Sequence, residues 1–182
     1  TGARSRDRNG AGIRLEGRQL TVRHCFFHDN ESGVIAGNIS GGKIFISHSE
    51  FSRNGHANGQ AHQIYVGRIA ELDVQFSYIH SANIGSAVKS RAALSRVLYN
   101  RIVDGRDGTS NYSIDLSIGG RALVMGNVIE QSNKTGNHTL ITYAPEGGGG
   151  LKSNEVFIVH NTIVNDRASG NFIKNHAKKP LF

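Results

Sequence analysis

The sequence is short of cysteine, proline and long apolar runs. Cys25 stands alone among the 182 residues, which excludes an internal disulfide and a cysteine-based zinc site. No run approaches the roughly eighteen apolar residues that a spanning helix needs, so we expect no membrane span. The chain opens without a Met or an apolar targeting segment. Two prolines against 23 glycines indicate a strand-rich chain with many tight turns.

Length and charge limit the number of domains and the kinds of binding partner that the sequence allows. A chain of 182 residues has the size of one domain, and we take residues 1–182 as a single unit. The net charge of +7 favours polyanionic partners such as nucleic acid, acidic polysaccharide or an anionic surface. A nucleic-acid partner is not expected, because the Lys and Arg residues are dispersed, aromatics are 7% and no recognition motif is present.

The chain is built from a repeat. Six segments superimpose as an alternating apolar strand, a small or amide residue and a second apolar pair: LTVRHCFFHDN, IFISHSEFSRN, LDVQFSYIHSAN, SRVLYNRIVDG, ALVMGNVIEQS and VFIVHNTIVND. A second strand series lies between them, and both series alternate with period two rather than 3.6. Short strands repeating every 23–28 residues or so, without helices, predict a parallel β-solenoid of about six to seven coils.

A column of small and amide side chains supports the solenoid. Aligning the six segments matches Cys25, Ser49, Ser77, Asn100, Asn127 and Asn161. We expect the three asparagines to stack at coil spacing, where their amides hydrogen-bond along the axis. The serines extend that stack less strongly.

The segments GAGIRLEGRQLTVRHCFFHDNESGV and VFIVHNTIVND resemble the right-handed parallel β-helix of the pectate lyase-like superfamily. The resemblance covers about residues 10–175, is specific for fold and implies little about function, since lyases, hydrolases, epimerases and phage adhesins share this fold. It implies an all-β chain, secreted, periplasmic or on the cell surface. The repeat pattern is still running at NFIKNHAKKPLF, which favours a fragment of a longer solenoid lacking its caps.

The second strand series defines one face of the solenoid. Its inward column is predicted to be Ile13, Val34, Ile64, Val88, Ile114, Leu140 and Ile173. The adjacent outward column is then Arg14, Ile35, Tyr65, Lys89, Asp115, Ile141 and Lys174. Two positions further along, the outward residues are Glu16, Gly37, Gly67, Arg91, Ser117, Tyr143 and His176. This face therefore gathers a patch of Lys, Arg, Tyr, His and Asp.

Such a patch suits β-elimination on a uronic-acid polysaccharide, in which a carboxylate is neutralised, a proton removed and the leaving oxygen protonated. By analogy with the lyases of this fold, we nominate Lys89 as base, Arg91 as carboxylate clamp, and Tyr143 or His62 as acid. The neighbouring side chains that would contact substrate are Tyr65, Asp115, His138 and Tyr112.

Simpler interpretations compete with this one. Lys89 opposite Asp115 is also an ordinary cross-strand ion pair, and such a pair holds the amine protonated, which opposes a base role. Glu146 with Asp115 offers oxygens for Ca²⁺, but two carboxylates on different coils lack the tight spacing of such sites. Ca²⁺ therefore stays a candidate cofactor without a defined set of ligands.

Three functions remain open. The first is a lyase acting on an acidic polysaccharide, which the resemblance implies would be a monomer. The second is a non-catalytic glycan-binding or adhesin solenoid, for which the resemblance implies a trimer. The third is a purely structural repeat whose charges keep the faces soluble.

Overall fold

The computed structural model describes residues 2–5, 10–56, 60–148 and 150–177, and all the helices and strands within these ranges are β-strands. None of these residues forms a helix long and apolar enough to cross a membrane. The strands build three parallel sheets, of seven, six and six strands. The prediction of an all-β chain is thereby confirmed.

Each sheet collects one strand from every coil. Sheet A contains β1 (Ala11–Leu15), β4 (Ser32–Ala36), β7 (Ile64–Val66), β10 (Val88–Ser90), β13 (Ile114–Leu116), β16 (Thr139–Tyr143) and β19 (Asn171–Asn175). Sheet B contains β2 (Gln19–Arg23), β5 (Lys43–Ser47), β8 (Glu71–Gln75), β11 (Leu94–Leu98), β14 (Arg121–Met125) and β17 (Glu155–Val159). Sheet C contains β3 (Phe26–His28), β6 (Glu50–Ser52), β9 (Tyr78–His80), β12 (Arg101–Val103), β15 (Val128–Gln131) and β18 (Thr162–Asn165).

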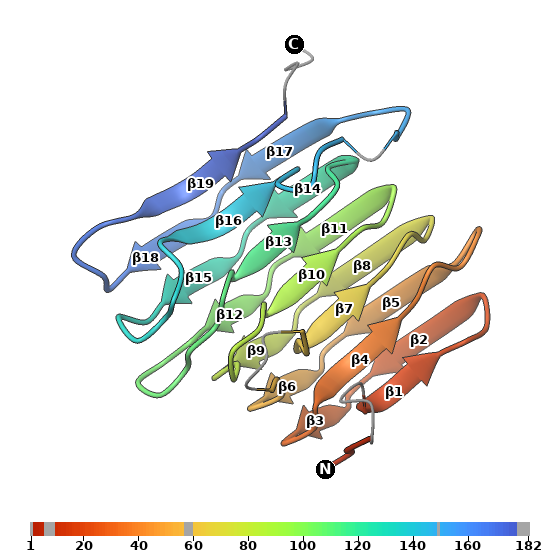
Figure 1. Cartoon of the computed structure of the whole chain (residues 1–182), viewed down its shortest axis with the longest axis horizontal. Helices are drawn as coiled ribbons and strands as arrows, with labels where there is room; N and C mark the ends of the chain where they lie inside the picture. The colour runs from red at the N-terminus through yellow and green to blue at the C-terminus, as the bar shows by residue number, and fades with distance from the viewer. Residues whose placement is uncertain (1, 6–9, 57–59, 149, 178–182) are drawn as a thin grey trace.

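The chain winds as a right-handed parallel β-helix, as expected. It runs through sheets A, B and C in turn, and each strand pairs in parallel with its counterparts on the neighbouring coils. Figure 1 shows the strands of sheet A in front of those of sheet B, with successive coils stacked from the red end to the blue end. This winding is the one that right-twisted strands favour for parallel connections.

The apolar core runs along the inside of the stack. Val34, Ile64, Val88 and Ile114 occupy one inward column of sheet A, and none of the four is exposed to solvent. Their counterparts in sheets B and C, such as Val74, Val97, Ile79 and Ile129, are also fully buried. No coil could bury these residues alone, so the core exists only because the coils stack.

The register predicted for β16 was wrong by one residue. Ile114 pairs with Ile141, not Leu140, and Asp115 pairs with Thr142, not Ile141. All five residues of β16 are buried, so both faces of this strand are covered and it lacks the polar and apolar alternation that sets register. As a consequence Tyr143 lies in the core instead of on the outer face.

The predicted column of small and amide side chains forms a hydrogen-bonded ladder. We call it the turn ladder; its members are Cys25, Ser49, Ser77, Asn100, Asn127 and Asn161. The Asn127 Oδ1 accepts from the backbone N–H of Asn100 at 2.9 Å, and the Asn161 Oδ1 does the same for Asn127 at 3.0 Å. The Asn127 amide also donates to the carbonyl of Val97 at 2.8 Å. Each amide thus satisfies turn backbone groups on more than one coil.

A stack of rings accompanies the turn ladder on the outside. His24, His48, Phe76 and Tyr99 precede ladder residues and all have φ between 48° and 55°. Their ring centroids lie 5.2, 5.2 and 5.4 Å apart along the stack. On the next coil a Cβ at Gly126, whose φ is 68°, would come within 2.4 Å of the Tyr99 ring. The absence of a side chain at Gly126 therefore leaves room for the Tyr99 ring.

We expect Asn127→Ala to lower the free energy of unfolding by about 2–4 kcal/mol, because several buried backbone partners lose their hydrogen bonds at once. Urea unfolding followed by far-UV circular dichroism measures the change. Asn133→Ala, at an exposed position, is the matched control and should change stability by less than about 0.5 kcal/mol. Equal effects from the two substitutions would mean that the turn ladder contributes nothing specific.

Candidate functional site

The predicted patch lies at the middle of the outer face of sheet A. The register places Lys89 of β10 between Tyr65 of β7 and Asp115 of β13. The expected ion pair is present, with 3.0 Å between the Lys89 Nζ and the Asp115 Oδ2. Asp115 is only 2% exposed and also accepts a hydrogen bond from Ser117 at 2.8 Å. This carboxylate is therefore fixed within the fold.

Arg91 binds a second carboxylate that sequence reasoning did not assign to it. Its Nε and Nη2 donate to the two carboxylate oxygens of Glu146 at 2.7 and 2.6 Å. Its Nη1 donates to the Tyr65 hydroxyl oxygen at 2.6 Å. The Lys89 Nζ lies 3.5 Å from the same Glu146 Oε1. We call Tyr65, Lys89, Arg91, Asp115 and Glu146 the sheet-A cluster.

Charge within the sheet-A cluster is balanced, with two cations and two carboxylates. The fork of hydrogen bonds from Arg91 holds the pKa of the Glu146 carboxyl below its usual value, and the same bonds raise the pKa of Arg91. The side chain of Glu146 is 41% exposed and that of Asp115 2%. Water thus reaches one of the two carboxylates and not the other.

A turn after β16 brings Glu146 over the sheet. Ala144 has a φ of 56° and donates its N–H to the carbonyl of Leu116 at 2.9 Å. The Glu146 N–H then donates to the Ser117 carbonyl at 2.9 Å, and Gly147 closes the turn on the Ala144 carbonyl at 3.0 Å. The chain thereby folds back above β13. The sequence feature that could have pointed to Glu146 is its place before a glycine run in the long connection between β16 and β17, but this feature did not specify Arg91 as the partner.

His62, one of the two nominated acids, is 5% exposed and lies beside the sheet-A cluster. Burial, with smaller effects from the charges of Lys89 and Arg91, lowers its pKa to about 3. Its Nδ1 accepts a hydrogen bond from the Ser86 N–H at 2.9 Å, and its ring packs on Tyr65 with centroids 5.6 Å apart. The ring is neutral at neutral pH, which is the opposite of what a proton donor requires.

Tyr143, the other nominated acid, was wrongly placed on the outer face. It is 1% exposed, and its hydroxyl donates to the Gly120 carbonyl at 2.6 Å. Burial raises its pKa to about 12. The physical cause is the one-residue shift of β16, which turns Tyr143 into the core. Its hydroxyl stabilises the turn before β14 and is not available to a ligand.

The remaining predicted residues lie apart from the centre of the patch. His138 precedes β16 and bonds to Arg167 at 3.2 Å and Ser169 at 3.4 Å. Tyr112, partly buried, precedes β13. Within the described ranges, neither of them forms a hydrogen bond or ion pair with the side chain of Lys89 or Arg91. The structure thus brings together Tyr65, Lys89, Arg91 and Asp115 from the predicted set and leaves His138 and Tyr112 at the edge of the sheet.

The two carboxylates that were considered for Ca²⁺ already flank a cation. Lys89 places its ammonium 3.0 Å from Asp115 and 3.5 Å from Glu146, where a metal bridging the two would lie. Across the described ranges no group of three or more His, Cys, Asp or Glu side chains could hold a metal ion. The Lys89 ammonium therefore takes the place between these two carboxylates.

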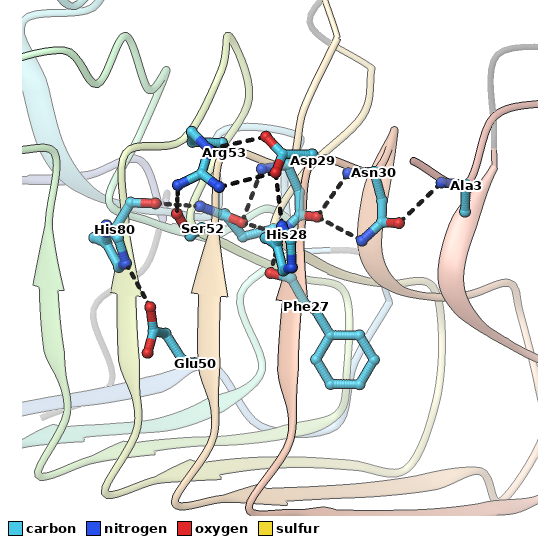
Figure 2. A network of polar contacts seen from close by, with 11 residues as sticks. Ala3, Phe27, His28, Asp29, Asn30, Glu50, Ser52, Arg53 and His80 are labelled. Carbon is cyan, nitrogen blue, oxygen red and sulfur yellow. Dashed lines mark hydrogen bonds and ion pairs between the residues drawn. The ribbon is translucent and has the colours of Figure 1, made fainter. Parts of the chain in front are cut away.

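A second polar cluster lies where sheet C turns into sheet A on the first coils (Figure 2). Arg53 forks onto Asp29 with two hydrogen bonds of 2.8 Å, and His28 lies 2.6 Å from the same carboxylate. These partners hold the pKa of Asp29 well below its usual range. Asn30 and Asn54 continue the cluster inward, with Asn30 donating its backbone N–H to the Asn54 Oδ1 at 3.1 Å.

This second cluster serves the fold. Its buried part resembles the turn ladder, because side-chain amides again bond to backbone groups. Asn54 also donates to the Phe27 carbonyl at 2.9 Å, and the Ala3 N–H donates to the Asn30 Oδ1 at 3.0 Å. Figure 2 shows His80 turned toward Glu50 on the neighbouring coil, at 3.1 Å. The Arg53–Asp29 and His80–Glu50 pairs each join adjacent coils, so the cluster ties coils together.

Comparison with known proteins finds no match among protein-family models, curated proteins or solved structures. The β-helix architecture is therefore shown by the structure itself, and the likeness to the pectate lyase-like superfamily stays a prediction.

The buried neutral ring of His62 predicts a specific loss of stability in acid. The unfolded pKa of about 6.5 exceeds the folded value of about 3, so the unfolded chain takes up the proton first as the pH falls through that window. Below pH 6 the wild type should lose up to about 1.4 kcal/mol per pH unit relative to His62→Asn, whose amide oxygen can accept the Ser86 N–H. Chemical unfolding of both proteins from pH 7.5 to 4.5 measures this difference. Parallel curves would contradict it.

Proposed function

We propose that the outer face of sheet A binds a carboxylated polysaccharide. The observation that carries this proposal is the convergence of Arg91 and Lys89 on a single carboxylate, whose two oxygens each accept from the guanidinium and one of which also lies 3.5 Å from the ammonium. A planar guanidinium that donates twice matches the geometry of a carboxylate better than that of a neutral sugar hydroxyl. Tyr65 holds the guanidinium in that orientation through a hydrogen bond of 2.6 Å.

A polymeric ligand suits the shape of this face. Residues on successive coils lie about 4.8 Å apart, so a chain lying along the axis passes one outward side chain after another. The accessible part of this outward column consists of Ile35, Tyr65 and Lys89, which are partly exposed, whereas the next two residues in the column, Asp115 and Thr142, are buried. The chain's net charge of +7 favours association with a polyanion. Together these features support a uronate polysaccharide of the kind found outside cells.

Binding without cleavage fits the geometry better than lyase chemistry. Lys89 makes ion pairs with two carboxylates, His62 is neutral and Tyr143 is in the core. A lyase remains the second candidate because the Tyr65 hydroxyl lies next to the carboxylate position, where a phenol can serve in proton transfer. In that case C5, which bears the carboxylate, loses its proton to the Tyr65 oxygen, the glycosidic C4–O4 bond breaks as a C4–C5 double bond forms, and the proton passes to the departing O4.

Calorimetric titration with polygalacturonate, alginate and hyaluronate tests the proposal, with neutral dextran as the control ligand. We expect binding to at least one uronate polymer, weakened by salt, and at least about tenfold loss in Arg91→Gln. Arg91 is the residue to change because removing Lys89 would leave the buried Asp115 without its cation. Arg121→Gln removes the same charge from sheet B, where Arg121 is exposed, and should bind normally.

Two further readouts separate the functions. Ultraviolet absorbance of an unsaturated product during incubation would identify a lyase, and its absence alongside binding would identify a binding module. Tyr143→Phe should lower stability and leave binding intact, because its hydroxyl bonds within the core. Failure to bind any uronate polymer, at low salt and neutral pH, would overturn the proposal and favour a structural solenoid.

A further inference from the structure

We propose that Glu146 occupies the position that the ligand's carboxylate takes, so that a ligand binds by displacing this side chain from Arg91 and Lys89. This inference rests on the proposed function and specifies how its site works. In the unliganded protein, the Glu146 carboxylate thus fills the place of a uronate carboxylate. The unliganded protein is then partly blocked by one of its own residues.

The contacts of Glu146 are those that a bound carboxylate would need. Both of its oxygens accept from the Arg91 guanidinium, at 2.7 and 2.6 Å, and one of them lies 3.5 Å from the Lys89 ammonium. A second carboxylate cannot use these donors while Glu146 holds them. Competition between the two is therefore built into the geometry.

Glu146 is the carboxylate that can leave. Its side chain is 41% exposed, so a change of rotamer transfers its charge into water at little cost. Its backbone forms one hydrogen bond to the neighbouring coil, from its N–H to the Ser117 carbonyl, and Gly147 beside it has a φ of 83°. Asp115, in contrast, is 2% exposed and bonded to Lys89 and Ser117. Moving Asp115 would strand a buried charge.

Neutralising Glu146 should therefore strengthen binding. The apparent affinity of a partly occluded site falls in proportion to the fraction of molecules in which the site is free. We expect Glu146→Gln to bind the polyuronate identified above about five- to tenfold more tightly than the wild type. Fully methyl-esterified polygalacturonate, which has no free carboxylate, should show no such gain.

Glu155→Gln is the matched control. Glu155 is 38% exposed and pairs with Arg121 on sheet B at 3.5 Å, so its replacement makes the same change in net charge on another face. We expect it to leave the affinity for polygalacturonate, measured by calorimetry, within about twofold of wild type. Adding Arg91→Gln to Glu146→Gln should abolish the gain. Thermal unfolding of each variant confirms that the protein titrated is folded, and Glu146→Ser provides a second neutral side chain.

The outcomes separate this inference from the proposed function. If the wild type binds and Arg91→Gln weakens it, but Glu146→Gln gains nothing, the displacement model is wrong and the binding face stands. If Glu146→Gln and Glu155→Gln gain equally, the effect is general electrostatics and the displacement model is again wrong. If the wild type binds weakly and only the Glu146 variants bind tightly, both proposals are supported. If no variant binds, the proposed function itself fails.

Discussion

In-register stacking of the coils is the constraint on which the rest of this structure depends. Parallel pairing places each residue about 4.8 Å from its counterparts on the adjacent coils, so a side chain always has the same position above and below it. The turn ladder maintains this register at one corner, where the Asn100, Asn127 and Asn161 amides bond coil to coil. Side chains of one kind therefore accumulate in columns, as amides inside the turn and as rings outside it.

A charged side chain in such a column needs a partner of opposite charge, either next to it in the column or on another segment of the chain. Lys89 is followed by Asp115 in its column, and this alternation allows the carboxylate to be buried at 2% exposure. The residues that match Arg91 on the neighbouring coils, Gly67 and Ser117, carry no charge, and its counterion, Glu146, comes from a turn. The two ion pairs differ in consequence. Breaking a buried pair costs about 3–5 kcal/mol, while an exposed pair contributes about 0.2–1 kcal/mol. The first pair thus belongs to the fold, and the second can be exchanged for a ligand.

The same constraint explains which parts of the site could be predicted. The columns through Tyr65, Lys89 and Asp115 follow from alternation in strands with one polar face, so their neighbours were assigned correctly. In β16 the residues Thr139–Tyr143 are covered on both faces, and alternation carries no information about register there. The shift of one residue moved Tyr143 from the predicted surface into the core. Glu146 could not be assigned because turns obey no repeat, and its partner lies 55 positions earlier in the chain.

By itself, the sequence determined the architecture: period-two strands, the turn ladder and the succession of coils are local or repeated patterns, and in-register stacking converts them into columns. It also determined that Lys89 and Arg91 share an outer face with Tyr65. Only the tertiary structure decided the chemistry of that face. Burial made His62 neutral and fixed Asp115, and the turn after β16 placed the Glu146 carboxylate on Arg91. Those outcomes depend on which groups are desolvated and on where a non-repeating turn lies. Neither can be predicted from the periodicity of a strand.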